Sequence, residues 1–177
     1  MTILTRMCTS VDGFVTTADG WPVQLAFSKW DAGALGFYEL QARCDAVVMG
    51  RTTFEPALGA PSWPWGDLTV YVLGSHVPPG TPTEVELVVD DDPARLLERI
   101  RTSGRGGHVH LVGGPRTIET FRALGGLDEL HLMVLPILTG AGRRLTPEVD
   151  VDSSLQLIDT RGWPHGVVEL TYAVGRP

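Results

Sequence analysis

Residues 45–54 constrain the fold more than any other stretch, because an apolar strand there passes through one glycine directly into a helix. The segment reads Asp-Ala-Val-Val-Met-Gly-Arg-Thr-Thr-Phe. Its four consecutive apolar residues are typical of a central strand of an α/β sheet that is covered on both faces. Gly50 allows another backbone or a ligand to approach closely, and Thr52 and Thr53 are suited to cap the helix. Because Arg51 adds a guanidinium beside the amide groups of a helix start, the junction indicates a phosphate-binding site.

A second junction of the same kind lies further along the chain. The apolar alternation over 108–112 predicts a strand, and a helix is expected to follow as far as Leu124. Between them stand Gly113, Gly114, Pro115, Arg116 and Thr117. Two such junctions on neighbouring strands could hold the two phosphates of one dinucleotide. Neither contains G-x-G-x-x-G or G-x-x-x-x-G-K, which argues against a Rossmann domain and a P-loop enzyme.

The remaining pattern alternates strands with helices and ends in a hairpin. Strands are predicted at 3–10, 68–73 and 84–89, helices at 31–44 and 93–101, and an antiparallel pair at 155–160 and 167–174. Asp31 falls in the first turn of the first of these helices, where a carboxylate is favourable. The order predicts an α/β protein with a mostly parallel sheet and an antiparallel edge. We interpret residues 1–177 as a single domain.

Composition limits the classes of partner. With a net charge of -7, the chain has no basic stripe to follow a nucleic acid or an anionic membrane, so neither partner is expected. Cys8 and Cys44 are the only cysteines, which argues against a disulfide framework and predicts two buried apolar thiols. No segment has the length of a membrane span or the pattern of a signal peptide, so a cytoplasmic protein is expected. His108 and His110 alternate on one strand without a third ligand nearby, and no metal site is predicted.

Five motifs taken in order resemble one family. They are Ser10-Val-Asp-Gly-Phe, the 45–54 segment, Val72-Leu-Gly-Ser, Leu111-Val-Gly-Gly-Pro-Arg-Thr-Ile and Pro136-Ile-Leu-Thr-Gly-Ala-Gly. Together they resemble the dihydrofolate reductase-like superfamily, and within it the C-terminal reductase domain of bifunctional riboflavin-biosynthesis deaminase-reductases in a stand-alone form. The resemblance implies a three-layer fold with a mixed, mostly parallel sheet of about eight strands and an antiparallel C-terminal hairpin. It also implies an NADPH-dependent oxidoreductase.

The resemblance further implies roles for individual residues. Gly50, Arg51, Thr52 and Thr53 would hold cofactor phosphate, Ser75 the ribose-phosphate end, and the segment from Gly113 to Thr117 the pyrophosphate. Asp31 is the candidate catalytic acid, with a helix cap as the alternative. Asp12, with Gly13 and Phe14, is either a substrate contact or a turn former. No H-x-E followed by P-C-x-x-C occurs in the sequence, so the deaminase half of the bifunctional enzymes is not expected here.

Two classes of function remain open. The first is an NADPH-dependent reductase that transfers a hydride to a small pterin-like or pyrimidine-like heterocycle. The second is a non-catalytic nucleotide-binding or oligomerising module that keeps the cofactor cleft. A homodimer is expected in either case, because the apolar run from Leu130 to Leu138 exceeds what one strand of a small sheet usually buries and reductases of the resembled type pair through their sheets.

Overall fold

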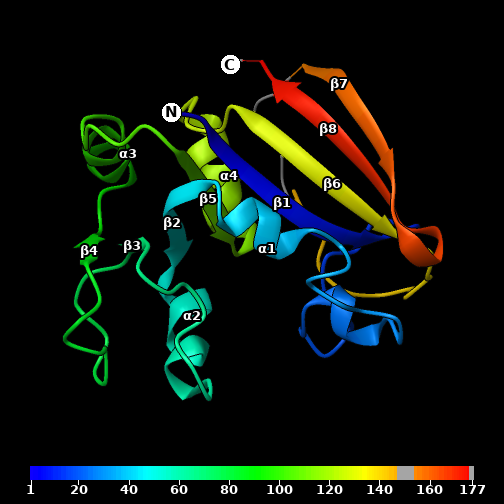
Figure 1. Cartoon of the computed structure of the whole chain (residues 1–177), viewed down its shortest axis with the longest axis horizontal. Coiled ribbons are helices and arrows are strands. Elements are labelled where there is room, and N and C mark those ends of the chain that lie inside the picture. The colour runs from blue at the N-terminus through cyan, green and yellow to red at the C-terminus, as the bar shows by residue number, and fades with distance from the viewer. Residues whose placement is uncertain (147–153, 176–177) are drawn as a thin grey trace.

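A single eight-stranded sheet, in the order β4-β3-β2-β5-β1-β6-β8-β7, runs through the computed structural model, which describes residues 1–146 and 154–175 (Figure 1). Strands β1 to β6 pair in parallel, whereas β8 pairs antiparallel with both β6 and β7. The strands are β1 (Ile3–Ser10), β2 (Cys44–Gly50), β3 (Thr69–Leu73), β4 (Leu87–Asp90), β5 (His108–Gly113), β6 (Glu129–Leu135), β7 (Leu155–Gly162) and β8 (Val168–Val174). The predicted mixed sheet with its antiparallel C-terminal hairpin is confirmed.

Helical segments cover both faces of this sheet. The α-helices are α1 (Phe37–Gln41), α2 (Arg51–Phe54), α3 (Pro93–Arg101) and α4 (Pro115–Ala123), and the 3-10 turns are η1 (Val23–Ala26), η2 (Glu55–Gly59) and η3 (Pro164–Gly166). Alternate residues of β2 point to opposite faces, as a strand requires. Val48 packs with Leu96 of α3 and Phe121 of α4, whereas Val47 packs with Phe54 of α2. The structure therefore has the three layers that the resemblance implied.

The helix predicted over 31–44 is much shorter than expected. Only Phe37–Gln41 is helical, and Asp31 lies in the turns that precede it. Gly36 has φ +71° and occupies the N-cap of α1, a left-handed conformation that glycine adopts at little steric cost. The apolar spacing correctly indicated which residues face the core, because Leu35 and Leu40 are both buried. The backbone before Phe37, however, forms turns and not a helix.

The strand predicted over 84–89 begins later, at Leu87. The Val85 amide donates to the Pro82 carbonyl in a turn, and the first contact with β3 is the hydrogen bond from the Val70 amide to the Glu86 carbonyl. Within residues 1–146 and 154–175, no helix combines the length and apolar character needed to cross a membrane.

Candidate functional site

The two glycine junctions meet at one edge of the sheet. The register pairs Met49 with Gly113, so β2 and β5 end side by side. A Cβ atom added to Gly50 would lie 2.6 Å from Thr117 Oγ1, closer than side-chain atoms normally approach. One added to Gly114 would lie 3.6 Å from Thr53 Oγ1. Each junction therefore touches the helix of the other, and both helices start at one place.

The end of β3 completes this edge. Gly50 pairs with Leu73, and a Cβ atom on the next residue, Gly74, would lie 3.6 Å from Arg51 Cβ. Ser75 follows on the exposed surface, where its hydroxyl lies 3.1 Å from His76 Nδ1. The structure thus brings Ser75, predicted from a separate motif, to the same edge as Arg51.

The start of α2 differs from the prediction. The helix is a single turn that begins at Arg51, so Gly50 takes the N-cap position and supplies no capping side chain. Thr52 and Thr53 lie inside the turn and do not cap it. Because so short a helix carries little aligned peptide dipole, any attraction for an anion here depends on the Arg51 guanidinium. That guanidinium is exposed, and its Nη1 lies 2.6 Å from Glu55 Oε1.

The start of α4 has the properties expected of an anion site. This helix is nine residues long, with Pro115 in its first turn and Gly114 as its N-cap. No side chain caps it, and its first turn contains no acidic residue. Arg116 is exposed, and its guanidinium makes no ion pair with any residue in the described ranges. The free amides, the helix dipole and Arg116 together favour negative charge at this point.

Asp12 has a structural role in this fold. Its Oδ1 accepts from the Thr139 amide at 3.2 Å and its Oδ2 from the Gly140 amide at 2.7 Å. A hydrogen bond from the Ser10 hydroxyl, together with those amides, holds the pKa of Asp12 below its ordinary value. Both carboxylate oxygens are used within the protein, which favours the turn-forming interpretation over a substrate contact.

The residues after Asp12 strengthen the same connection. Gly13 has φ +86°, and the Phe14 ring lies under the Arg144 guanidinium at 4.9 Å. Phe14 also forms an isolated backbone bridge with Arg144, whose side chain is exposed. Residues 12–14 therefore join the loop after β1 to the loop after β6.

Asp31 is exposed and lies in a turn rather than in a helix. Its Oδ1 accepts from the Ala34 amide at 2.9 Å, and its carbonyl accepts from the Leu35 amide at 3.0 Å. This is the capping interaction of an isolated turn. Trp30, the preceding residue, makes an edge-to-face contact with Phe37.

Comparison with known proteins decides the family. The RibD C-terminal domain family matches residues 1–168. The chain belongs to the RibD C-terminal domain family. The Bacillus subtilis protein YwjB is 25% identical over 162 residues, which cover 89% of this chain and 90% of YwjB.

Solved structures agree with this membership. A Shewanella sp. PV-4 protein assigned to riboflavin biosynthesis is 27% identical with a TM-score of 0.80, over 99% of this chain and 100% of its own. Enterococcus faecalis dihydrofolate reductase, solved with NADP(H) and RAB-propyl, shares the fold at 18% identity and a TM-score of 0.60, over 98% and 96% of the two chains. The RibD C-terminal domain protein therefore has a dihydrofolate reductase-like fold, as its motifs implied.

A buried ion pair on the face that carries α1 was missed by sequence reasoning. Arg6 of β1 and Glu169 of β8 are both buried, and Arg6 Nε lies 2.9 Å from Glu169 Oε1. Arg6 Nη1 also donates to the Gly36 carbonyl at 2.8 Å, and Trp163 Nε1 donates to Glu169 Oε2 at 2.8 Å. Burial raises the pKa of Glu169, but hydrogen bonds from His131 and Trp163 and the charge of Arg6 outweigh it, so the pKa lies below its ordinary value.

This pair links the turn before α1 to β1 and to the β7–β8 hairpin. Its only signal in the sequence was an arginine inside the otherwise uncharged strand at 3–10. The two cysteines are free and buried as predicted. Among the residues that the structure describes, no group of three His, Cys, Asp or Glu side chains is arranged to hold a metal ion.

Proposed function

We propose that this RibD C-terminal domain protein is an NADPH-dependent reductase that transfers a hydride to a small heterocyclic substrate, of the pterin type or the riboflavin-pathway pyrimidine type. The observation that carries the proposal is the meeting of three strand ends at glycines, Gly50, Gly74 and Gly114, at one edge of the sheet. Backbone amides are open to a ligand where side chains are missing. Family membership and the fold shared with an NADP(H)-bound dihydrofolate reductase support the same function.

The residues present fit a dinucleotide. A Cβ atom at Gly50 would lie 2.6 Å from Thr117 Oγ1, so the close approach of the two junctions depends on glycine there. In this proposal the backbone amides of residues 113, 114, 116 and 117 and the Arg116 guanidinium bind the pyrophosphate, while Arg51 and Ser75 bind the phosphate at the adenosine end. The nicotinamide, when bound, supplies the hydride, and the chain supplies binding, orientation and exclusion of water.

A proton must reach the substrate along with the hydride, and Asp31 is the residue we propose as its donor. The second candidate is a nucleotide-binding module without turnover. It is favoured by the exposure of Asp31 and by the hydrogen bond from the Ala34 amide, which suit a turn cap as well as a proton donor. The two candidates share the cofactor site and differ only in catalysis.

One experiment distinguishes the reductase from the binding module, and both from a protein that does not bind the dinucleotide. NADPH binding is titrated by tryptophan fluorescence, and NADPH oxidation is followed by absorbance with a panel of pterins and pyrimidines. Arg116→Ala should weaken the binding of NADPH and NADH alike, because both carry the pyrophosphate. Glu86→Gln is the control, because Glu86 contacts Thr69 at the start of β3, at the strand ends opposite the site. It should change neither NADPH binding nor NADH binding. Binding with turnover supports the reductase, binding without turnover supports the module, and absence of binding contradicts both.

We also propose a homodimer formed through the antiparallel edge of the sheet. β6 ends at Leu135, and Leu138, the last residue of the predicted apolar run, is exposed. The edge strand β7 is exposed along its whole length and carries the apolar residues Leu155, Leu157 and Ile158. An exposed apolar edge strand is a surface that a second chain can cover.

A further inference from the structure

The charge of Arg51 is already engaged by a neighbour in its own helical turn. Arg51 Nη1 and Glu55 Oε1 are 2.6 Å apart, four residues apart in sequence, and the two side chains are 45% and 40% exposed. The stem of Arg51 lies along Gly74, since a Cβ atom there would be 3.6 Å from Arg51 Cβ and 4.0 Å from its Cδ. The guanidinium is therefore held between the end of β3 and the Glu55 carboxylate.

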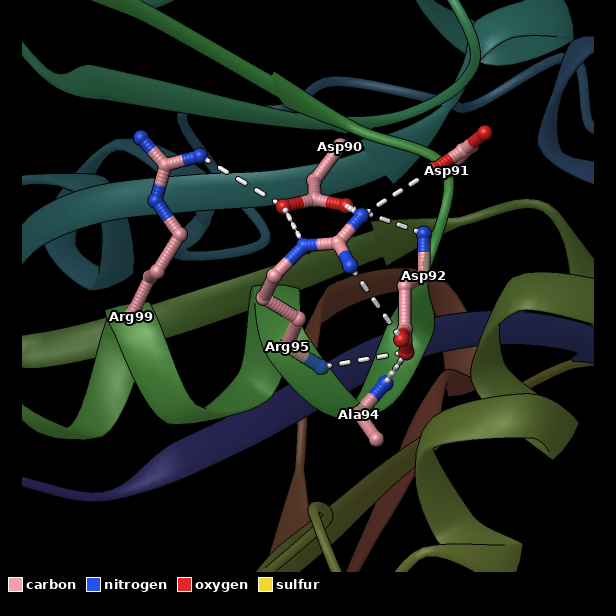
Figure 2. Close-up of polar contacts among 6 residues, drawn as sticks. All are labelled: Asp90, Asp91, Asp92, Ala94, Arg95 and Arg99. Carbon is pink, nitrogen blue, oxygen red and sulfur yellow. Dashed lines mark hydrogen bonds and ion pairs between the residues drawn. The ribbon is translucent and has the colours of Figure 1, made fainter.

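Two other arginines near the end of β3, Arg95 and Arg99, are already paired with aspartates (Figure 2). Asp90, the last residue of β4, accepts the Gly74 amide through its carbonyl at 2.9 Å, which places it beside the strand end that leads to Ser75. Its buried carboxylate receives Arg95 Nη2 at 2.6 Å and Nε at 2.8 Å, and Arg99 Nη1 at 3.5 Å. Asp91 and Asp92 also contact Arg95. Three carboxylates and two guanidinium groups give this cluster a formal charge of -1, so it supplies no positive charge for a phosphate near Ser75. The guanidinium that remains beside this strand end is that of Arg51, whose stem lies along Gly74.

We infer that Glu55 determines the preference of the site between a phosphorylated and an unphosphorylated adenosine ribose, by competing with the phosphate for Arg51. The inference rests on the proposed function. A 2′-phosphate must displace the Glu55 carboxylate from the guanidinium or bind beside it, and a second negative charge at such short range repels a dianion. A ribose with a free 2′-hydroxyl carries no charge to be repelled and does not require Arg51. Glu55 therefore lowers affinity for NADPH selectively.

The test is Glu55→Gln, with NADPH and NADH each titrated by tryptophan fluorescence and folding checked by thermal unfolding. Removing the carboxylate should tighten NADPH binding by about three- to tenfold and change NADH binding by less than about twofold, on the scale of an exposed ion pair and one short-range repulsion. The gain should shrink as salt is raised, since exposed charges are screened.

Two further variants complete the design. Glu86→Gln removes an equally charged carboxylate that pairs with Arg105 at 2.8 Å on the opposite edge of the sheet, and it should leave both affinities unchanged. In an Arg51→Ala background, Glu55→Gln should produce a much smaller gain, because no guanidinium remains to be released.

Several results would overturn the inference. Weaker NADPH binding in Glu55→Gln would mean that Glu55 orients Arg51 for the phosphate, and no change would mean that it does not compete. Equal changes for NADPH and NADH would place its effect on a group that the two share. If the unaltered protein bound neither dinucleotide, the proposed function would fail first and the inference with it, whereas the preceding results leave the proposed function intact.

Discussion

Replacing Gly50 by alanine tests the contact between the two glycine junctions. Gly50 has φ -80° and ψ 158°, an extended conformation open to any residue, so alanine causes no backbone strain. Its Cβ atom, however, would lie 2.6 Å from Thr117 Oγ1, and Thr117 is buried at the start of α4. We expect such overpacking to cost about 1–3 kcal/mol, offset by roughly 0.4–1 kcal/mol from the reduced freedom of the unfolded chain. The net loss in the free energy of unfolding then lies between about 0 and 2.6 kcal/mol.

The structure also specifies how the loss can be reversed. With Thr117→Ala the Oγ1 atom is removed, and the nearest remaining atom of that side chain is its Cβ, at an ordinary 3.9 Å. In this background Gly50→Ala should be neutral, or stabilising by up to about 1 kcal/mol. The two substitutions should therefore show a coupling energy of about 1–3 kcal/mol, which equals the cost of the removed overlap.

Urea denaturation of the two single variants, the double variant and the unaltered protein measures this coupling. Gly59→Ala is the matched control, because a Cβ atom there meets nothing within 4 Å and the residue ends the neighbouring turn η2. It should not lower stability. Single-variant effects that add to within about 0.5 kcal/mol would refute the reasoning, since the junctions would then not be in contact.

The remaining predictions concern the adenosine end, the candidate acid, an acid-sensitive pair and assembly. Arg51→Ala should weaken NADPH binding by about 1.5–3 kcal/mol and leave NADH binding nearly unchanged, as fluorescence titration would show; equal losses would assign Arg51 to the shared pyrophosphate. Asp31→Asn should lower kcat roughly ten- to a hundredfold with NADPH affinity within about threefold, whereas a lower Tm alone would make Asp31 a turn cap. Hydrogen bonds from Arg95 lower the pKa of Asp90 from 3.8 to about 2, so its stabilisation is complete above pH 3.8 and is lost as pH falls toward 2. The free energy of unfolding measured across that pH interval should depend less on pH in Asp90→Asn than in the unaltered protein. Identical pH profiles for the two proteins would exclude this contribution. Finally, the solution mass at micromolar concentration should be twice that of one chain, and a mass near 19.1 kDa would contradict the homodimer.

Much of the fold could be predicted because its signals are local. The run from Ala46 to Met49 has the composition of a doubly covered strand, and the structure places all four residues at or below 1% exposure. The helix from Pro93 to Arg101 was recognisable from the acids before it and the arginines at its end, and Asp92 does cap it through the Ala94 and Arg95 amides. The family resemblance then added the number of layers and strands.

The segment around Asp31 shows where local signals end. Its apolar spacing suited a helix from 31 to 44, but a Cβ atom at Gly36 would overlap the Trp163 ring. That close approach, and the hydrogen bond from Arg6 to the Gly36 carbonyl, favour a left-handed turn there and delay α1 to Phe37. Trp163 and Arg6 both lie outside residues 31–44 in the sequence. The helix propensity of that segment therefore contains no information about them.

The sequence by itself determined the strands, the glycine junctions and the residue types of the candidate site, because these follow from backbone preferences and from the spacing of neighbouring side chains. Only the tertiary structure decided which of those side chains remain available to a ligand. Asp12 is bound to amides 127 and 128 residues away, and Arg6 to a carboxylate 163 residues away. Arg51, by contrast, faces both Gly74 and Glu55 at the edge where β2, β3 and β5 end. Contacts of this kind depend on how the strands are ordered in the sheet, and that order results from packing the whole core rather than from any one segment.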